Sequence, residues 1–357
     1  MGEVCYHQKG VNCMKRIVFE VIRAVVVGML LPALLVGFVL CVTAPRADGH
    51  QTVPGQTEYD PGQTTLPSLP AQTEPLPEEK AVISVVVEDT LTQMELEHYI
   101  LCVVLGEMPA SFEPEALKAQ AVVARTYALK VCGDESHHKG GAVCTVASCC
   151  QAYCPPEQYI SAGGSQAALE KVKSAVEATR GQVLTYEGEL VTATYFSCSG
   201  GATEDAAAVW GYEVPYLQSV ESPGEEDAYS YTQTTTMTAT EFRQKMAVRL
   251  KGSPQSWFGK VTYTRGGGVQ TIQIGGVSYR GTTIRALLGL RSTNFTVHVD
   301  GDTITITTKG YGHRVGMSQF GADAMAVRGS TYQQILAHYY RGTELVDVKD
   351  VSAALEK

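Results

Sequence analysis

The feature that most constrains this chain is an uncharged run near its amino terminus. Residues 24–42 carry no charge, and they follow three basic residues, Lys15, Arg16 and Arg23. A helix of this length can cross the hydrocarbon core of a bilayer, and basic residues favour the cytoplasmic side. We expect a cytoplasmic segment at 1–23 and a transmembrane anchor at 24–43, with the rest of the chain outside the cytoplasm. A cleaved signal peptide is the alternative, but Pro45 fits poorly after a cleavage site at Thr43-Ala44.

The segment after the expected anchor has the composition of a spacer. Residues 44–80 hold seven of the chain's 15 prolines, with Gln, Thr, Gly and acidic residues between them. Such a segment has little apolar surface to bury. We therefore expect a disordered linker at 44–80 and a globular domain that begins near Ala81.

The charge of the chain excludes one class of partner. The formal net charge is -9, and no basic cluster stands out in the bulk of the 357 residues. Nucleic-acid binding requires a positive surface, so we expect no nucleic-acid partner. A neutral or weakly charged polymer such as a glycan remains compatible with this charge.

The order of the expected elements predicts an α+β fold. Helices are expected from the Thr92–Glu95 capping-box pattern to Leu105, at 114–133 and at 167–179. A strand precedes them at 81–87. Strands then dominate the middle of the chain, and helices return at its end. These later elements are a hairpin at 183–196, strands within 266–279 and 295–308, and helices at 318–327 and 331–339. We expect one mixed helix/strand domain at 81–347 and a tail at 348–357; the family resemblance described next implies that this domain is catalytic and has a glycan-binding cleft.

Three segments carry a family resemblance. They are ILCVVLGEMPASFEPEALKAQAVVARTYAL (100–129), SCSGGATEDAAAVWGYEVPYLQSVESP (197–223) and GYGHRVGMSQFGADAMAVRGSTYQQILAHYYRGTEL (310–345). In order and spacing they closely resemble the stage II sporulation protein D family, over about 81–347. The resemblance implies a lytic transglycosylase that cleaves the bond between N-acetylmuramic acid and N-acetylglucosamine in peptidoglycan strands without water. It also implies that the catalytic acid is the glutamate of GEMP, Glu107.

The residues around Glu107 fit that role on physical grounds. A glycosidase that uses water or a nucleophile normally needs two carboxyl groups. One carboxyl suffices when the sugar's own 6-hydroxyl attacks and a 1,6-anhydro ring forms. Glu107 is expected at the carboxyl end of a helix, flanked by Leu105, Met108 and Phe112. The helix dipole and the apolar surroundings should both raise its pKa.

Further residues of the resembling segments are candidates for substrate binding. Three of them have a structural alternative: Arg125 as a helix-surface arginine, the 197–201 segment as a strand-to-loop turn, and His313 as a packed histidine. Arg314 stands where we expect glycine in this family, so the loop around it could differ. The candidates are Gln120, Arg125, Ser197, Ser199, Gly200, Gly201, His313 and Gln319.

The segment HHKGGAVCTVASCCQAYC, residues 137–154, predicts a metal site. Some members of the resembling family carry zinc here. Alignment on CQAY assigns the ligands to His138, Cys144, Cys149 and Cys150, with His137 as a substitute for His138. One histidine and three cysteines form a common structural zinc set that leaves no open position for substrate. Disulfides, including a Cys132–Cys154 bridge, and free thiols are the alternatives.

Two other functions compete with the lytic reaction. A zinc-dependent wall amidase or peptidase would need an open metal site and a motif such as HExxH, which the sequence lacks. A non-catalytic glycan-binding or scaffold relative would not need the GEMP glutamate. The family resemblance further implies action during engulfment at the mother-cell membrane of the sporulation septum. Its substrate would be strands denuded of stem peptides, with stage II sporulation proteins P and M as partners.

Overall fold

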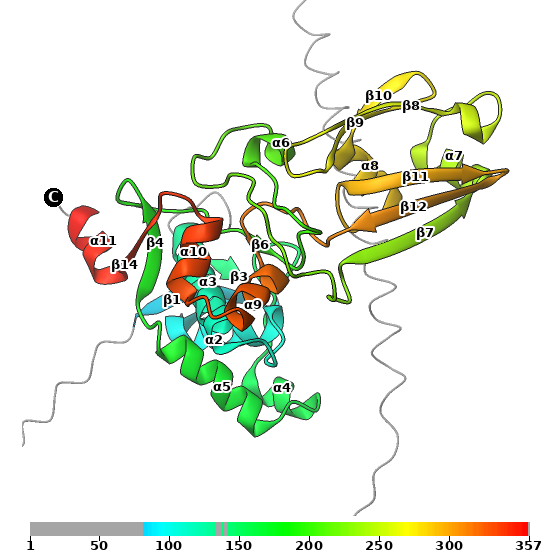
Figure 1. The fold of residues 1–357 in the computed structure, drawn as a ribbon. Coiled ribbons are helices and arrows are strands. Elements are labelled where there is room, and N and C mark those ends of the chain that lie inside the picture. The colour runs from blue at the N-terminus through cyan, green and yellow to red at the C-terminus, as the bar shows by residue number, and fades with distance from the viewer. Residues whose placement is uncertain (1–80, 133–137, 139–140, 356–357) are drawn as a thin grey trace, which may run out of the picture. The chain divides into compact units, whose positions relative to one another are not determined.

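The computed structural model describes residues 81–132, 138 and 141–355 (Figure 1). They belong to one compact unit that contains two hydrophobic cores. The helix-rich first core precedes and follows the strand-rich second core in the sequence. The fold is therefore α+β, as predicted, with one core inserted between the two halves of the other.

The first core is built around α3 (Pro114–Cys132). Its central residues are small and fully buried, among them Ala119, Ala121, Ala124 and Ala128. Small side chains allow close approach of neighbouring helices, and four helices contact α3. These are α2 (Leu96–Glu107), α5 (Gln166–Glu177), α9 (Gln319–Val327) and α10 (Tyr332–Tyr339). The helices predicted at 114–133, 167–179, 318–327 and 331–339 are thus confirmed within two residues at each end.

Three small sheets border this helical core. β1 (Val82–Val87) pairs with β2 (Thr90–Glu95) and β3 (Val143–Cys144). β4 (Gln182–Tyr186) lies between β14 (Glu344–Asp347) and β5 (Glu189–Leu190). The third sheet is a short parallel pair of β6 (Tyr195–Phe196) and β13 (Met317–Ser318). Segments more than 120 residues apart in the sequence therefore meet at β6 and β13.

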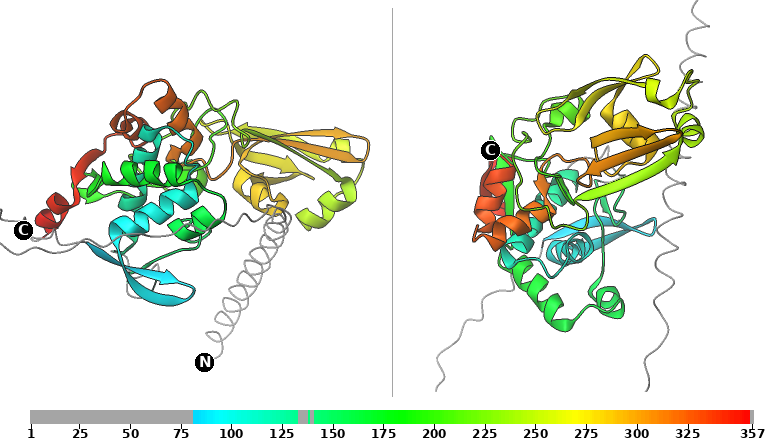
Figure 2. Two further views of the ribbon diagram at one scale, coloured as in Figure 1. Left: turned by 90° about the horizontal axis from the view of Figure 1, so that it is seen from below. Right: turned by 45° about the vertical axis from the view of Figure 1, so that its right-hand side comes forward.

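The second core lies between two three-stranded sheets and two helices (Figures 1 and 2). One sheet contains β7 (Thr232–Thr238), β12 (Thr303–Lys309) and β11 (Asn294–Asp300). The other contains β8 (Phe258–Tyr263), β9 (Val269–Ile274) and β10 (Val277–Arg280). The helices are α7 (Ala239–Met246) and α8 (Gly281–Leu288), and Phe242 stacks on Trp257 within this core.

Four short helices complete the described chain. They are α4 (Pro156–Ser161), α6 (Ala206–Trp210), a 3₁₀ turn at Pro254–Ser256, and α11 (Val348–Leu355). The predicted tail at 348–357 is therefore largely helical, because α11 continues directly from β14.

Two local predictions need correction. The Thr92–Glu95 pattern does not cap a helix, because 90–95 forms β2 and the Thr92 hydroxyl donates to the Val85 carbonyl. The helix begins at Leu96 without a side-chain cap. In the 183–196 segment only β4 and β5 form the expected hairpin, through Glu187 and Gly188, which both have positive φ. β6 leaves the hairpin because it pairs with β13 instead.

The membrane predictions are also corrected. No helix among residues 81–132 and 141–355 is long and apolar enough to cross a bilayer. Helix α2 has only 12 residues, and the 19 residues of α3 include four charged side chains: Glu115, Lys118, Arg125 and Lys130. The predicted anchor at 24–43, with its flanks 1–23 and 44–80, lies outside the described residues. The described residues thus form an α+β fold in which no helix could cross a membrane, and the predicted single-pass location in the mother-cell membrane is not supported.

A buried ion pair joins the two cores. Arg314 is fully buried in a left-handed backbone conformation (φ 66°), and its Nη1 lies 3.0 Å from Oε1 of the buried Glu204. The same Glu204 oxygen accepts from the Thr264 hydroxyl and the Gly268 N–H in the β8–β9 turn. Arg314 also donates to three carbonyls, those of Ser199, Ala202 and Gly266.

Candidate functional site

A cavity of about 720 Å³ opens at the carboxyl end of α2. Segments from both halves of the first core meet there, because the parallel pair of β6 and β13 brings them together. Several aromatic side chains and one carboxylate face it. Its lining includes Glu107, Tyr127, Cys149, Cys150, Tyr195, Phe196, Ser197, Trp210, Tyr311, Gly312, His313 and Gln319.

Glu107 is the last residue of α2, so its carboxyl group lies beside the negative end of the helix dipole. Met108 and Phe112, which follow Glu107 in the sequence, are both buried. The Ala152 backbone N–H donates to Glu107 Oε1 over 2.6 Å. Burial raises the pKa of Glu107, and hydrogen bonds from the Ala152 N–H, Tyr195 and Gln319 partly oppose the rise. The direction agrees with the sequence-based expectation, and it favours a protonated acid at the wall of the cavity.

Tyr195 supports the acid from β6. Its hydroxyl accepts a 2.9 Å hydrogen bond from Nε2 of the buried Gln151. Burial, followed by the charge of Glu107, raises the pKa of Tyr195 well above its usual value. The hydroxyl therefore keeps its proton and can donate to Glu107. Neither Tyr195 nor Gln151 was identified from the sequence, although Gln151 belongs to the CQAY segment that aligned the metal ligands.

Gln319 contacts the acid from the start of α9. The Ser318 hydroxyl caps this helix by accepting from the Gly321 N–H. Nε2 of Gln319 donates to Oε1 of Gln120, 3.5 Å away on α3. Gln120 is fully buried and does not line the cavity, and its own Nε2 has no partner among the described residues. The structure therefore places Gln319 at the acid and Gln120 behind it.

His313 lines the same cavity as a neutral imidazole. Burial, reinforced by the positive charge of Arg285, lowers the pKa of His313 to about 4. Its Nδ1 accepts from the Val315 N–H over 3.1 Å. The ring packs at 5.6 Å from Phe196 and 5.9 Å from Trp210. His313 thus joins the aromatic wall and carries no charge near neutral pH.

Arg125 lies away from the cavity. Its guanidinium forms two hydrogen bonds with the Glu97 carboxylate, of 2.9 and 2.6 Å, and a third with the Gln182 carbonyl. The side chain is fully buried. These contacts tie α2 and α3 to β4, so the structure assigns Arg125 to the packing of the first core.

The Ser197–Gly201 segment divides between two environments. Ser197 lines the cavity. Ser199 and Gly200 instead bind the buried Glu225 carboxylate: the Ser199 N–H donates over 2.6 Å, the Ser199 hydroxyl over 2.9 Å and the Gly200 N–H over 3.4 Å. The Gly201 N–H donates to the Ser199 hydroxyl. A Cβ at Gly200 would lie 2.8 Å from the Gly310 nitrogen, so this position requires glycine. The three residues shape the loop behind the cavity and do not line it.

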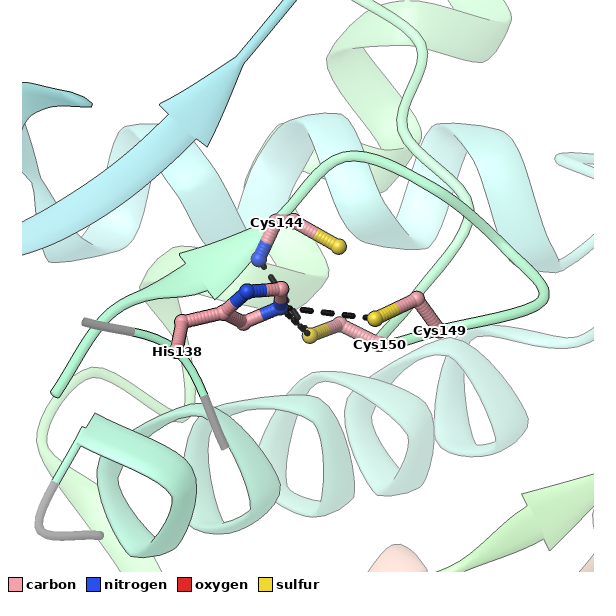
Figure 3. Close-up of side chains that lie close together, drawn as sticks. All are labelled: His138, Cys144, Cys149 and Cys150. Atoms are coloured by element: carbon pink, nitrogen blue, oxygen red, sulfur yellow. Dashed lines mark hydrogen bonds between the residues drawn. The ribbon is translucent and has the colours of Figure 1, made fainter. Parts of the chain in front are cut away.

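The four predicted metal ligands lie together: His138, Cys144 at the end of β3, and Cys149 and Cys150 after it (Figure 3). His138 Nε2 is 3.3 Å from Cys149 Sγ and 3.5 Å from Cys150 Sγ. With Cys144, all four ligand atoms lie within 4.8 Å of one another. Zinc takes such thiolate and imidazole ligands in sets of four, so the donor set fits the ion in type and number, with atoms that are already close together. None of the seven cysteines in the described part forms a disulfide, and His137 lies outside the described residues.

In the sequence, the cluster directly precedes residues that contact Glu107 and Tyr195. Cys149 and Cys150 also line the cavity. The next two residues are Gln151, which holds Tyr195, and Ala152, whose N–H meets Glu107. A displacement of this loop would therefore move two of the groups that surround the carboxyl.

Comparisons with known proteins identify the family of this chain. Residues 87–186 match the model of a family described as stage II sporulation protein. The chain is 38% identical to stage II sporulation protein D of Bacillus amyloliquefaciens, over 96% of this chain and 98% of that protein. It is 42% identical to stage II sporulation protein D of Bacillus subtilis (strain 168), over 72% and 76%. An amidase enhancer of the same strain is 31% identical over 68% of this chain and 39% of that protein. The chain belongs to the stage II sporulation protein D family.

Proposed function

We propose that this protein is a lytic transglycosylase that cleaves peptidoglycan strands between N-acetylmuramic acid and N-acetylglucosamine. The observation that carries the proposal is the single acid of the cavity. Among the described residues that line it, Glu107 is the one carboxylate. Hydrolysis with water or a protein nucleophile normally uses a pair. A lone acid with a raised pKa suits a reaction in which the substrate supplies its own nucleophile.

The proposed reaction needs one proton donor that later accepts a proton. Protonated Glu107 gives its proton to the glycosidic oxygen as the bond to the anomeric carbon breaks. The 6-hydroxyl of the muramic acid attacks that carbon, and the Glu107 carboxylate takes up the hydroxyl proton. The products are a 1,6-anhydromuramic acid end and a new N-acetylglucosamine 4-hydroxyl, with Glu107 protonated again. The Ala152 N–H and the side chains of Tyr195 and Gln319 stabilise the carboxylate between the two transfers.

The walls of the cavity suit a sugar chain. Trp210 packs on Tyr212, which is 61% exposed, and Tyr311 is 46% exposed beneath the Arg291 guanidinium. Aromatic faces offer apolar contact to the C–H surfaces of sugar rings.

We further propose that His138, Cys144, Cys149 and Cys150 hold a structural zinc ion. Four protein ligands complete a tetrahedral shell, so bound zinc would hold the loop and leave no position for water or substrate. A zinc peptidase or amidase needs such an open position, and the cluster does not offer one. The ion's contribution would be to fix the segment that positions Gln151 and Ala152.

Loss of the metal should lower stability and activity together. We expect the full-length protein to contain about one equivalent of zinc and Cys150→Ser to contain much less, because one thiolate of the set is lost. The variant should melt at a lower temperature and cleave more slowly. Cys154→Ser, outside the cluster, is the matched control and should keep its zinc. Metal analysis and thermal melting test this, and a wild-type protein free of zinc with full activity would contradict it.

Product analysis tests the proposed reaction. Purified glycan strands treated with the full-length protein should yield chains that end in 1,6-anhydromuramic acid and are lighter by one water than hydrolysed chains. Mass spectrometry distinguishes the outcomes. Reducing ends would indicate a hydrolase, released peptides an amidase or peptidase, and unchanged strands that remain bound would indicate a scaffold. Any of these three results would overturn the proposal.

The biological setting is proposed from the relatives. Two are named stage II sporulation protein D and one is named an amidase enhancer, which supports a role in cell-wall remodelling during sporulation. Engulfment, a preference for strands denuded of stem peptides, and stage II sporulation proteins P and M as partners remain predictions from the family resemblance.

A further inference from the structure

A second cavity carries positive charge that the proposed reaction does not use. It measures about 410 Å³ and is lined by Ala202, Ser219, Val220, Glu221, Arg265, His338 and Arg341. Neither Arg265 nor Arg341 forms an ion pair with any described residue. Among the described arginines, ion pairs are formed by Arg125, Arg180 and Arg314, and Arg265 and Arg341 belong to the larger group without one. Two guanidinium groups therefore face one cavity, with one carboxylate, that of Glu221, on its wall.

The floor of this cavity is fixed by the backbone. Ala202 and Glu221 form an isolated antiparallel bridge. His338 Nε2 lies 2.8 Å from the Glu221 carbonyl oxygen, which can only accept, so this nitrogen carries the proton. The imidazole also packs edge-on against Tyr339 at 4.8 Å. The histidine is thereby held in place, while the two arginines keep their donors available to a ligand.

The basic cavity adjoins the region of the acid through α6. Arg265 also lines a cavity of about 660 Å³, together with Asp205, Ala208, Gln218 and Tyr263. The first residues of α6 line that cavity, and its last residue, Trp210, lines the Glu107 cavity. A five-residue helix is only about 7.5 Å long. One chain segment, 202–221, thus borders all three cavities.

We propose that Arg265 and Arg341 form a subsite for a carboxylate carried by the glycan strand, outside the cavity that holds Glu107. This inference rests on the proposed function, because it takes its ligand from the same polymer. Muramic acid without a stem peptide bears a lactyl carboxylate, so a denuded strand presents a charge at every second sugar. The planar fork of arginine matches a carboxylate in shape and hydrogen bonding. A stem peptide converts that carboxylate to an amide and removes the charge.

Binding to defined strands tests the subsite separately from catalysis. The full-length chain with Glu107→Gln serves as the parent, and its dissociation constant is measured for purified denuded strands. Arg265→Gln or Arg341→Gln should each weaken binding about three- to ten-fold. Arg249→Gln makes an equal change of charge at an exposed position between α7 and β8, and it should have no such effect. The parent's affinity should fall with added salt more steeply than that of the Arg265→Gln/Arg341→Gln variant.

Chemical modification of the glycan strands gives a second test of the subsite. Conversion of the lactyl carboxylates to methylamides should weaken binding of the parent and leave the double variant unchanged. Neutral chitin oligosaccharides should bind the parent and the double variant equally. The proposal is wrong if the arginine variants lose affinity for neutral and charged strands alike, or if they behave as Arg249→Gln does. Because every arm measures binding by a chain that lacks the acid, failure of the lytic reaction would leave these results unaffected.

Discussion

Glu107→Gln lowers the rate of glycan cleavage by about 10³-fold or more in the proposed reaction, because the amide can neither donate nor accept the transferred proton. The substitution is nearly isosteric and keeps an oxygen that can accept from the Ala152 N–H, so binding of the strands should change little. Initial rates on purified strands measure the loss. Glu113→Gln, which removes an exposed acid in the adjacent loop, is the control and should retain full activity.

The pH dependence of this activity follows from the burial of the acid. Burial raises the pKa of Glu107, so its protonated form persists to higher pH than in an exposed glutamate. Cleavage should therefore fall as the pH rises through that raised pKa. A raised carboxyl pKa also means that the charged form costs stability above it. Glu107→Gln should then melt at the same or a higher temperature than the wild type near neutral pH, with the difference vanishing in acid. A variant that is both inactive and unstable would contradict this assignment.

We expect Arg314→Ala to destabilise the protein by about 3–5 kcal/mol, because it leaves the fully buried Glu204 carboxylate without its counter-charge. It also leaves the carbonyls of Ala202 and Gly266 without their guanidinium donor. Equilibrium denaturation of the full-length protein measures the change. Alanine keeps a Cβ at the positive φ of this position, so backbone strain is matched between the two proteins.

Two further variants isolate the ion pair. Arg314→Gly relaxes the left-handed backbone, which should recover only about 1 kcal/mol of the loss. The double variant Arg314→Met/Glu204→Gln removes both charges and should be more stable than Arg314→Ala. A loss below about 1 kcal/mol for Arg314→Ala would show that the pair does not hold the two cores together.

The predictable part of the fold is the part governed by local patterns. The helices at 114–132, 166–177, 319–327 and 332–339 follow from apolar spacing and caps, and the β11–β12 hairpin covers the strands expected within 295–308. Local patterns also gave one wrong helix boundary. The Thr92–Glu95 pattern suggested a cap where pairing with β1 determines the structure. The same pattern at Thr238 and Glu241 was overlooked, although it does cap α7.

The sequence predicted part of the candidate site, namely residues that the structure brings to one cavity. Glu107, Ser197, His313 and Gln319 line one cavity, and His138 meets its cysteines beside it. Arg125, Ser199, Gly200 and Gly201 lie elsewhere, because a segment can belong to a family's active region while its side chains serve packing. Tyr195 was missed for the opposite reason. It reaches the acid only through the pairing of β6 with β13, a contact between distant segments that no local periodicity encodes.

The contact between Ala152 and Glu107 has a consequence for genetic screens. The donor is the peptide nitrogen, and the Ala152 side chain takes no part in it. Exchanges at codon 152 that preserve the amide hydrogen would thus leave the interaction in place, and proline alone would delete it. Saturation mutagenesis should then show that position 152 tolerates many residues, within the limit set by side-chain size, and that proline causes a sharp defect.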